Sequence, residues 1–254
     1  MKIAVSGKGG VGKTTLSSLL ARYWAKKGYR VLAVDADQDA NLGSALGIDT
    51  TGIVPVANME ELIHERTGAK PGTVGGFFKL NPRVDDLPDA LGRERDGVRV
   101  LVMGTVKKGG GGCICPESAL LKALMSHLVL YHKDIVVMDM EAGIEHLGRG
   151  TAQGVDRLII VVEPGRRSIE TAAKVQQLTE DIGLKKVVAV GSKVRSEREE
   201  EFLRNSLDGI PLIGILPFSE EIASADLENR PPNLDDPVIF EAIDRIAQGL
   251  QPSG

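Results

Sequence analysis

The stretch GKGGVGKTT, from Gly7 to Thr15, decides how the rest of the chain is interpreted. It fits the pattern G-x-x-x-x-G-K-[ST], in which glycines let backbone N–H groups turn inward around phosphate oxygens. We expect Lys13 to reach the β and γ phosphates and Thr14 to ligate Mg²⁺. An apolar run precedes the stretch and a helical pattern, TTLSSLLARYWAKKG, follows it. The sequence thus predicts a strand, a phosphate-binding loop and a helix. The loop residues expected to bind nucleotide are Gly7, Gly9, Gly10, Val11, Gly12, Lys13, Thr14 and Thr15.

Apolar runs rich in β-branched residues alternate with helical patterns along the whole chain. Near-continuous apolar runs suit strands that are buried on both faces, and the segments between them are long enough for crossover helices. We therefore expect the α/β fold of a P-loop NTPase, a mostly parallel, twisted sheet of about seven to eight strands flanked by helices. The expected strands are Ile3–Ser6, Val31–Asp35, Val98–Met103, Ile135–Asp139, Leu158–Val162, Val187–Gly191 and Leu212–Leu216.

Length and composition set the class of protein. With 254 residues, of which 42% are hydrophobic, the chain can form one domain with a sizeable core over residues 1–254. Residues 68–97, rich in Gly, Pro and charge, are expected to be a surface excursion of that domain. The net charge of −4 gives no overall attraction for nucleic acid or anionic lipid. No apolar run reaches the ~18 residues of a membrane span, and no signal-peptide pattern is present. These features predict a cytoplasmic protein without nucleic-acid or membrane partners.

Two of the expected strands end in carboxylates. Asp35 and Asp37 close the strand in VLAVDAD, and Asp139 closes the strand in DIVVMD. The carboxyl ends of parallel strands meet at one edge of the sheet, where open α/β sheets bind their ligands. We therefore expect a Mg²⁺ ion near Asp35 and Asp139, with Asp139 holding it through water.

The only two cysteines, Cys113 and Cys115, stand one residue apart in GGGGCICPE. A disulfide between them would close a small, strained ring, so free or metal-bound thiols are expected. Pro116 suits the first position of a helix, whose dipole favours a thiolate at Cys115. Two thiolates leave a four-coordinate soft-metal site incomplete, whereas a twofold dimer supplies four. The pattern favours Zn²⁺ or Ni²⁺ shared across a homodimer over two small hydrophobic residues in a loop.

With Lys8 after its first glycine, KGGVGKTT resembles the deviant Walker A motif. This motif is typical of an ATPase class that includes septum-positioning, chromosome-partitioning, tail-anchored-protein-targeting and nitrogenase iron proteins. The resemblance implies that Lys8 crosses a dimer interface to the nucleotide of the partner. It also implies that Asp37 orients the attacking water and that the N–H of Gly143 senses the γ phosphate. Lys8, Lys13 and Asp37 are thus the expected catalytic residues.

The nucleotide base is expected near the ends of the last two strands. The class often carries an Asn-Lys pair after a late strand, and Ser192 and Lys193 stand at that place in VVAVGSKVRS. The stretch GILPFSEEIASAD resembles the later loop of the class, whose backbone, here around Pro217 and Phe218, contacts adenine. No Asp completes the N-K-x-D pattern that is typical of guanine sites, so ATP is the expected nucleotide.

Three longer stretches closely resemble the maturation ATPases of carbon monoxide dehydrogenase, the CooC type. They are CICPESALLKALMSHL, VVMDMEAGIEHLGRGTA and VVEPGRRSIETAAKV, and the resemblance runs over nearly the whole chain. It implies an ATP-dependent homodimer that assists nickel insertion into the active-site cluster of carbon monoxide dehydrogenase, its client. Nickel and the client come from the resemblance alone, because the residues by themselves indicate only a dimeric ATPase with a thiolate metal site.

Two other functions remain open. An ATP-dependent electron donor of the iron-protein type would need a second cluster cysteine just after switch II. The stretch MEAGIEHLG contains none. Four thiolates could still hold an iron–sulfur cluster. A positioning ATPase of the MinD or ParA type would need a basic amphipathic tail for a membrane or a cationic surface for DNA. The tail DPVIFEAIDRIAQGLQPSG is not basic.

Overall fold

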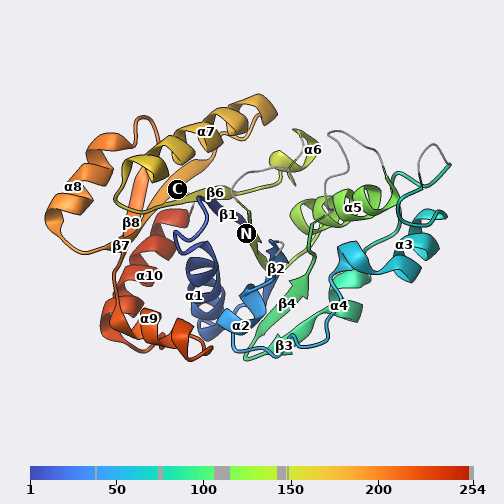
Figure 1. Cartoon of the computed structure of the whole chain (residues 1–254), viewed down its shortest axis with the longest axis horizontal. Helices are drawn as coiled ribbons and strands as arrows, with labels where there is room; N and C mark the ends of the chain where they lie inside the picture. The colour runs from blue at the N-terminus through green and yellow to red at the C-terminus, as the bar shows by residue number, and fades with distance from the viewer. Residues whose placement is uncertain (38, 74–76, 106–114, 142–146, 148, 252–254) are drawn as a thin grey trace.

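The computed structural model describes residues 1–37, 39–73, 77–105, 115–141, 147 and 149–251. Within these ranges an eight-stranded sheet has helices on both faces (Figure 1). Its strands are β1 (Lys2–Gly7), β2 (Val31–Ala36), β3 (Arg93–Arg95), β4 (Val98–Val102), β5 (Ile135–Met140), β6 (Arg157–Val162), β7 (Val187–Val194) and β8 (Leu212–Pro217). The α-helices are α1 (Lys13–Lys26), α2 (Leu42–Ala45), α3 (Glu60–Thr67), α4 (Leu87–Leu91), α5 (Pro116–Leu130), α6 (Arg149–Ala152), α7 (Arg166–Ile182), α8 (Glu197–Ser206), α9 (Glu220–Leu227) and α10 (Pro237–Leu250), and a 3₁₀ turn spans Val56–Asn58.

The order of the strands is β3-β4-β2-β5-β1-β6-β7-β8. All pairs are parallel except that of β3, which runs antiparallel to β4 at one edge. Every strand that the sequence predicts is present, and the fold class is confirmed. The additional strand, β3, lies within residues 68–97 together with α4. Val84 and Leu87 of this segment are buried, so part of it packs against the core.

The residues of β1 alternate between two cores. Ala4 belongs to the core beneath α5 and α7, whereas Ile3 and Val5 belong to the core beneath α1 and α10. Side chains of a strand point alternately to opposite faces, so a strand covered on both faces needs apolar residues at every position. This is the physical reason for the unbroken run IAV in the sequence. No helix among the described residues is both long and apolar enough to cross a membrane.

The register of the parallel strands brings distant residues to one edge of the sheet, which we call the carboxyl edge. Gly7, at the end of β1, is level with Val161 of β6. Asp35 of β2 is level with Asp139 of β5. Strand ends that are distant in sequence thus meet around the loop between β1 and α1, which is where such folds bind ligands.

Candidate nucleotide site

The loop between β1 and α1 depends on glycines for its shape. Gly10 and Gly12 have φ angles of 77° and 98°, a left-handed region that favours glycine. A Cβ atom on Gly7 would lie 2.5 Å from the carbonyl oxygen of Val161, so only glycine allows β1 to end this close to β6. The loop then enters the 14-residue helix α1 at Lys13. Free N–H groups at the start of this helix are available to an anion.

The two lysines of this loop contact groups of their own chain. Lys13 is 7% exposed, and its Nζ lies 3.5 Å from the carbonyl oxygen of Lys8, a contact at the limit of a hydrogen bond. The Nζ of Lys8 forms an ion pair with Oε1 of Glu163 at 3.2 Å. Glu163 follows the end of β6, the neighbour of β1 in the sheet. Both lysines therefore lie at the carboxyl edge. Lys13 has only a long hydrogen bond there, and Lys8 has a partly exposed ion pair.

A hydroxyl and a carboxylate lie side by side at the start of α1. The Oγ1 of Thr14 donates to Oδ2 of Asp139 at 2.6 Å, and the Oγ of Ser17 donates to its Oδ1 at 3.3 Å. Asp139 is 1% exposed, and burial raises its pKa to about 7, against a smaller lowering by the hydrogen bond from Thr14. An oxygen pair of this kind has the donor chemistry that Mg²⁺ prefers. A cation there would also remove the cost of burying the carboxylate.

Asp35 occupies both of its carboxylate oxygens with backbone groups. Oδ2 accepts from the N–H of Leu42 at 2.8 Å, and Oδ1 accepts from the N–H of Asp37 at 3.3 Å. Its side chain is fully buried, and burial raises its pKa to about 6. Asp35 thus fixes the backbone of the loop that follows β2, and its predicted place beside Mg²⁺ stays a prediction. Asp37 lies on that loop, and its Oδ1 accepts from the N–H of Asp39 at 3.2 Å.

A cavity of about 760 Å³ runs from the glycine loop to the ends of β7 and β8. Gly10 and Thr14 line one end, Asp37 lies on its wall, and Lys193 and Phe218 line the other end. This volume suits a nucleotide, since ligand pockets commonly measure about 300–1,000 Å³. The cavity therefore brings most of the residues that the sequence predicts for phosphate binding together with Ser192, Lys193, Pro217 and Phe218, which it predicts for the base, whereas Gly7 and Val11 do not line it.

Lys193 joins the end of the cavity where the base is expected to the glycine loop. This residue has a φ angle of 58°, rare for a residue with a side chain, and its Nζ donates to the carbonyl oxygen of Gly10 at 2.6 Å. Ser192 is buried, and its Oγ would lie 3.0 Å from a Cβ atom on Gly12. Backbone strain of this kind is often kept at functional sites, and here it places the end of β7 directly against the glycine loop.

Arg195 is a pocket residue that the sequence did not reveal. Its guanidinium carbon lies 3.7 Å from the centre of the Phe218 ring, and both residues line the cavity. The N–H of Phe218 donates to the carbonyl oxygen of Val194 at 2.9 Å, so the ends of β7 and β8 hold the two side chains together. The only signal in the sequence was the position of Arg195 two residues after Lys193. The stack forms a flat, cationic wall against which a base could lie.

The cysteine pair is only partly described. Cys115 is the N-cap of α5, is 9% exposed, and its Sγ donates to the Oγ of Ser118 at 3.1 Å. The predicted helix after Pro116 is confirmed. Cys113 and Gly143 lie outside the described residues. In the part of the chain that the structure does describe, no three side chains of His, Cys, Asp or Glu gather as a metal site.

Comparison with known proteins identifies the family. A family model described as the CobQ/CobB/MinD/ParA nucleotide-binding domain matches residues 2–232. The carbon monoxide dehydrogenase accessory protein CooC of Rhodospirillum rubrum is 47% identical over 229 residues, which cover 89% of this chain and 87% of that protein. An ATP-binding protein of Methanocaldococcus jannaschii is 44% identical over 238 residues, 92% of each chain.

Solved structures agree on the fold. The septum site-determining protein MinD of Pyrococcus horikoshii, solved with Mg-ADP, superposes with a TM-score of 0.68 at 22% identity and covers 98% of this chain and 95% of that chain. MinD of Aquifex aeolicus gives the same TM-score at 21% identity, over 98% and 96%. The chain therefore belongs to the CobQ/CobB/MinD/ParA nucleotide-binding family, and within it the chain is a CooC-type ATPase.

Proposed function

We propose that this ATPase works as a nucleotide-dependent homodimer that shares a Cys-x-Cys metal site and assists nickel insertion into carbon monoxide dehydrogenase. The observation that carries the proposal is the 47% identity to the accessory protein of Rhodospirillum rubrum over 89% of the chain. The two cysteines support its metal-binding part, because thiolates accept soft and borderline ions such as Ni²⁺ and Zn²⁺.

Hydrolysis of ATP uses the residues around the glycine loop. Thr14 and Asp139 would hold Mg²⁺, Asp139 through water, and the ion would supply charge neutralisation at the β and γ phosphates. Lys13 turns from its weak contact with the carbonyl oxygen of Lys8 to the phosphates. Asp37 orients a water molecule for in-line attack on the γ phosphate, while Asp35 holds the backbone of the loop on which Asp37 lies.

The base lies at the far end of the cavity. Ser192, Lys193, Pro217 and Phe218 surround it, and Arg195 adds the cationic face described above. In this arrangement the triphosphate and the base lie on the two loops that Lys193 joins by its hydrogen bond to Gly10.

Lys8 completes the site of the second subunit. In the closed dimer its ammonium group leaves its own chain and stabilises charge on the partner's phosphates during transfer. A mixture of the Lys8→Ala and Asp37→Asn variants tests this role. A mixed dimer has one site with both defects and one intact site, so activity should rise above that of either parent. Absence of recovery despite proven heterodimers would refute the exchange.

The metal site joins two copies of the chain. Four thiolates, Cys113 and Cys115 of each subunit, would hold the metal ion, because two thiolates alone leave a four-coordinate soft-metal site incomplete. Cys115 suits this role because it is the N-cap residue of the 15-residue helix α5, which fixes the backbone at one of the two thiols. Metal affinity must then depend on protein concentration, and the metal must strengthen dimerisation by the same coupling free energy.

Sedimentation with substoichiometric Zn²⁺ or Ni²⁺ tests the shared site. The wild type should dimerise with one ion per two chains, and the double variant Cys113→Ala, Cys115→Ala should lose this metal dependence while still binding ATP. Acidification should release the ion as the thiolates become protonated. One ion per monomer, or metal-driven dimers of the double variant as strong as those of the wild type, would rule out the shared site.

A further inference from the structure

Glu163 is the one acidic group paired with Lys8 in the described part of the chain. The side chain of Lys8 is 38% exposed and that of Glu163 is 31% exposed, and Nζ of Lys8 lies 3.2 Å from Oε1 of Glu163. They are separated by 155 residues in sequence, yet the register of β1 and β6 places them together, because Gly7 is level with Val161. The contact is thus a direct product of the sheet and joins two neighbouring strand ends of the carboxyl edge.

The backbones on the two sides of this pair differ in their freedom to move. Glu163 precedes Pro164, whose ring fixes one backbone angle, and its own N–H donates to the Oγ of Ser168 at 3.1 Å. Ser168 is 2% exposed and lies in the first turn of α7. Lys8, in contrast, is followed by two glycines. Glu163 is therefore a fixed anchor, and Lys8 is the member that can move.

We propose that Glu163 is a positioning residue that holds Lys8 on its own subunit until a second, ATP-bound copy of the chain displaces it. This inference rests on the proposed function, because it takes the nucleotide of the partner as the second binding place of Lys8. The carboxylate of Glu163 and the partner's triphosphate compete for one ammonium group. Closure of the dimer therefore requires the ion pair between Lys8 and Glu163 to break. Because the nucleotide must outcompete Glu163, dimerisation depends more strongly on the charge of a complete triphosphate.

The competition predicts the effect of removing the anchor's charge. Glu163→Gln keeps the shape of the side chain but releases Lys8, so the ATP-bound dimer should form about two- to fivefold more tightly, the range expected for a partly exposed ion pair. The gain should shrink at high salt, since screening already weakens such a pair. It should vanish when Lys8→Ala is also present, because there is then no cation to release.

The experiment measures the dissociation constant of the ATP dimer by sedimentation velocity. All variants carry Asp37→Asn so that ATP is not consumed, and the full chain is used throughout. The series contains the parent, Glu163→Gln, Lys8→Ala and the combination of the last two. Glu170→Gln is the matched control, since Glu170 is an exposed carboxylate on α7, the helix that follows Glu163. ATP affinity of the monomer and thermal unfolding are measured for each variant.

The outcomes separate this inference from the function on which it rests. If Lys8→Ala weakens the dimer while Glu163→Gln leaves it unchanged or weaker, Glu163 does not restrain Lys8 and the inference fails alone. It also fails alone if Glu163→Gln tightens the dimer equally in the Lys8→Ala background, or if Glu170→Gln tightens it as much. If Lys8→Ala dimerises like the parent, the cross-subunit role itself is wrong, and the restraint loses its purpose.

Discussion

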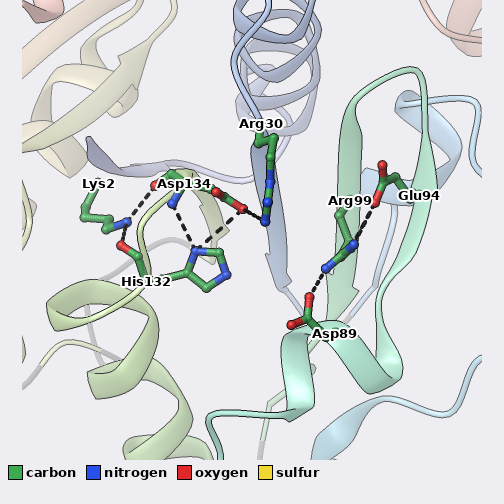
Figure 2. A network of polar contacts seen from close by, with 7 residues as sticks. All are labelled: Lys2, Arg30, Asp89, Glu94, Arg99, His132 and Asp134. Atoms are coloured by element: carbon green, nitrogen blue, oxygen red, sulfur yellow. Dashed lines mark hydrogen bonds and ion pairs between the residues drawn. The ribbon is translucent and has the colours of Figure 1, made fainter.

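Two lysines at opposite ends of β1 show how one residue type acquires two roles. Lys2, at the start of the strand, is 7% exposed and donates to the carbonyl oxygens of His132 and Asp134 (Figure 2). Burial lowers the pKa of Lys2, and the nearby carboxylates of Asp134 and Asp156 oppose that shift. Lys8, just beyond the other end, has one partly exposed partner. Fixed acceptors make Lys2 structural, whereas Lys8 is the lysine to which we assign a role at the partner's nucleotide.

The same contrast extends to the whole edges of the sheet. At the amino ends of the strands, Asp134 also pairs with Arg30 at 3.1 Å, and Arg99 of β4 pairs with Asp89 and Glu94 (Figure 2). These contacts tie α4 and β3 to β4 and close the loop before β5. At the carboxyl edge, by comparison, burial raises the pKa values of Asp35 and Asp139, Lys13 has only a 3.5 Å contact with a carbonyl oxygen, and Lys8 pairs with the partly exposed Glu163. Charged side chains at the amino ends of the strands thus pair with each other, whereas several at the carboxyl edge lie where a ligand could contact them.

The largest effect on ATP turnover should come from replacing Lys8, the lysine just beyond the carboxyl end of β1. Lys8→Ala should lower the turnover number for ATP by about 10²–10³-fold, because a donor to the developing phosphate charge is lost. The free energy of unfolding should stay the same, since the ion pair that is lost is partly exposed. Steady-state hydrolysis and urea unfolding measure the two quantities. A variant that unfolds more easily yet hydrolyses normally would reverse the roles assigned to the two lysines.

Replacement of Lys2 should give the opposite pattern. Lys2→Met fills a similar volume but leaves the partly buried carbonyl oxygens of His132 and Asp134 without their donor, so the free energy of unfolding should fall by about 1–3 kcal/mol. ATP turnover at 25 °C should be unchanged, because the site lies at the other end of β1. Urea unfolding beside a hydrolysis assay checks both. Lost turnover in a fully folded Lys2→Met variant would show that the two edges are coupled.

The difference between the edges could be predicted only in part. Continuous apolar runs revealed the seven parallel strands, and strand ends carrying Asp35 and Asp139 pointed to the ligand edge. The strand β3 was missed because Arg93, Glu94 and Arg95 include no apolar residue, and it is a strand only through its pairing with β4. Short edge strands of this kind leave almost no local pattern.

The polar contacts of the site were harder to foresee. Lys8 and Glu163 meet only because β1 and β6 are neighbours in a particular register, and no local pattern contains that register. For the same reason the sequence could not show that Asp35 points to the backbone N–H of Leu42. The Thr14–Asp139 contact was foreseeable in outline, since a motif defines the first residue and a strand end the second.

A smaller effect should follow from removing the wall of the base site. Arg195→Ala should weaken ATP binding by about 3–30-fold, the range for a cation facing an aromatic or base ring. Binding of inorganic tripolyphosphate should not change, because the glycine loop is intact. Arg198→Ala, an exposed arginine on the neighbouring helix, is the control. Equal dissociation constants for ATP, measured by titration of the Arg195→Ala and Arg198→Ala variants, would exclude a role of Arg195 at the base.

The smallest effect concerns the amino edge and pH. Burial lowers the pKa of His132 below its ordinary 6.5, with an opposing contribution from Asp134, and its Nδ1 accepts from the N–H of Asp134 at 3.3 Å. The native state therefore binds fewer protons than the unfolded state. The contribution of neutral His132 to the free energy of unfolding is therefore complete above pH 6.5 and is lost as the pH falls below that value.

The variant His132→Asn keeps an acceptor for that N–H and cannot titrate. Its melting temperature should fall less than that of the wild type between pH 7.5 and 5.5, by about 1–2 °C. The His127→Asn variant controls for the neighbouring histidine. Identical pH slopes for wild type and His132→Asn would assign the loss of stability in acid to other groups.

The edge strand β3 also affects the solubility of the molecule. A sheet edge offers unpaired backbone groups to any other chain, and aggregation through it is limited by charge and short length. Here the edge has three residues, Arg93, Glu94 and Arg95, and all three are exposed. A second sheet that docked there would have to bury these charges, so growth of the sheet from molecule to molecule is disfavoured. Strand-to-strand association of copies through β3 is thus disfavoured.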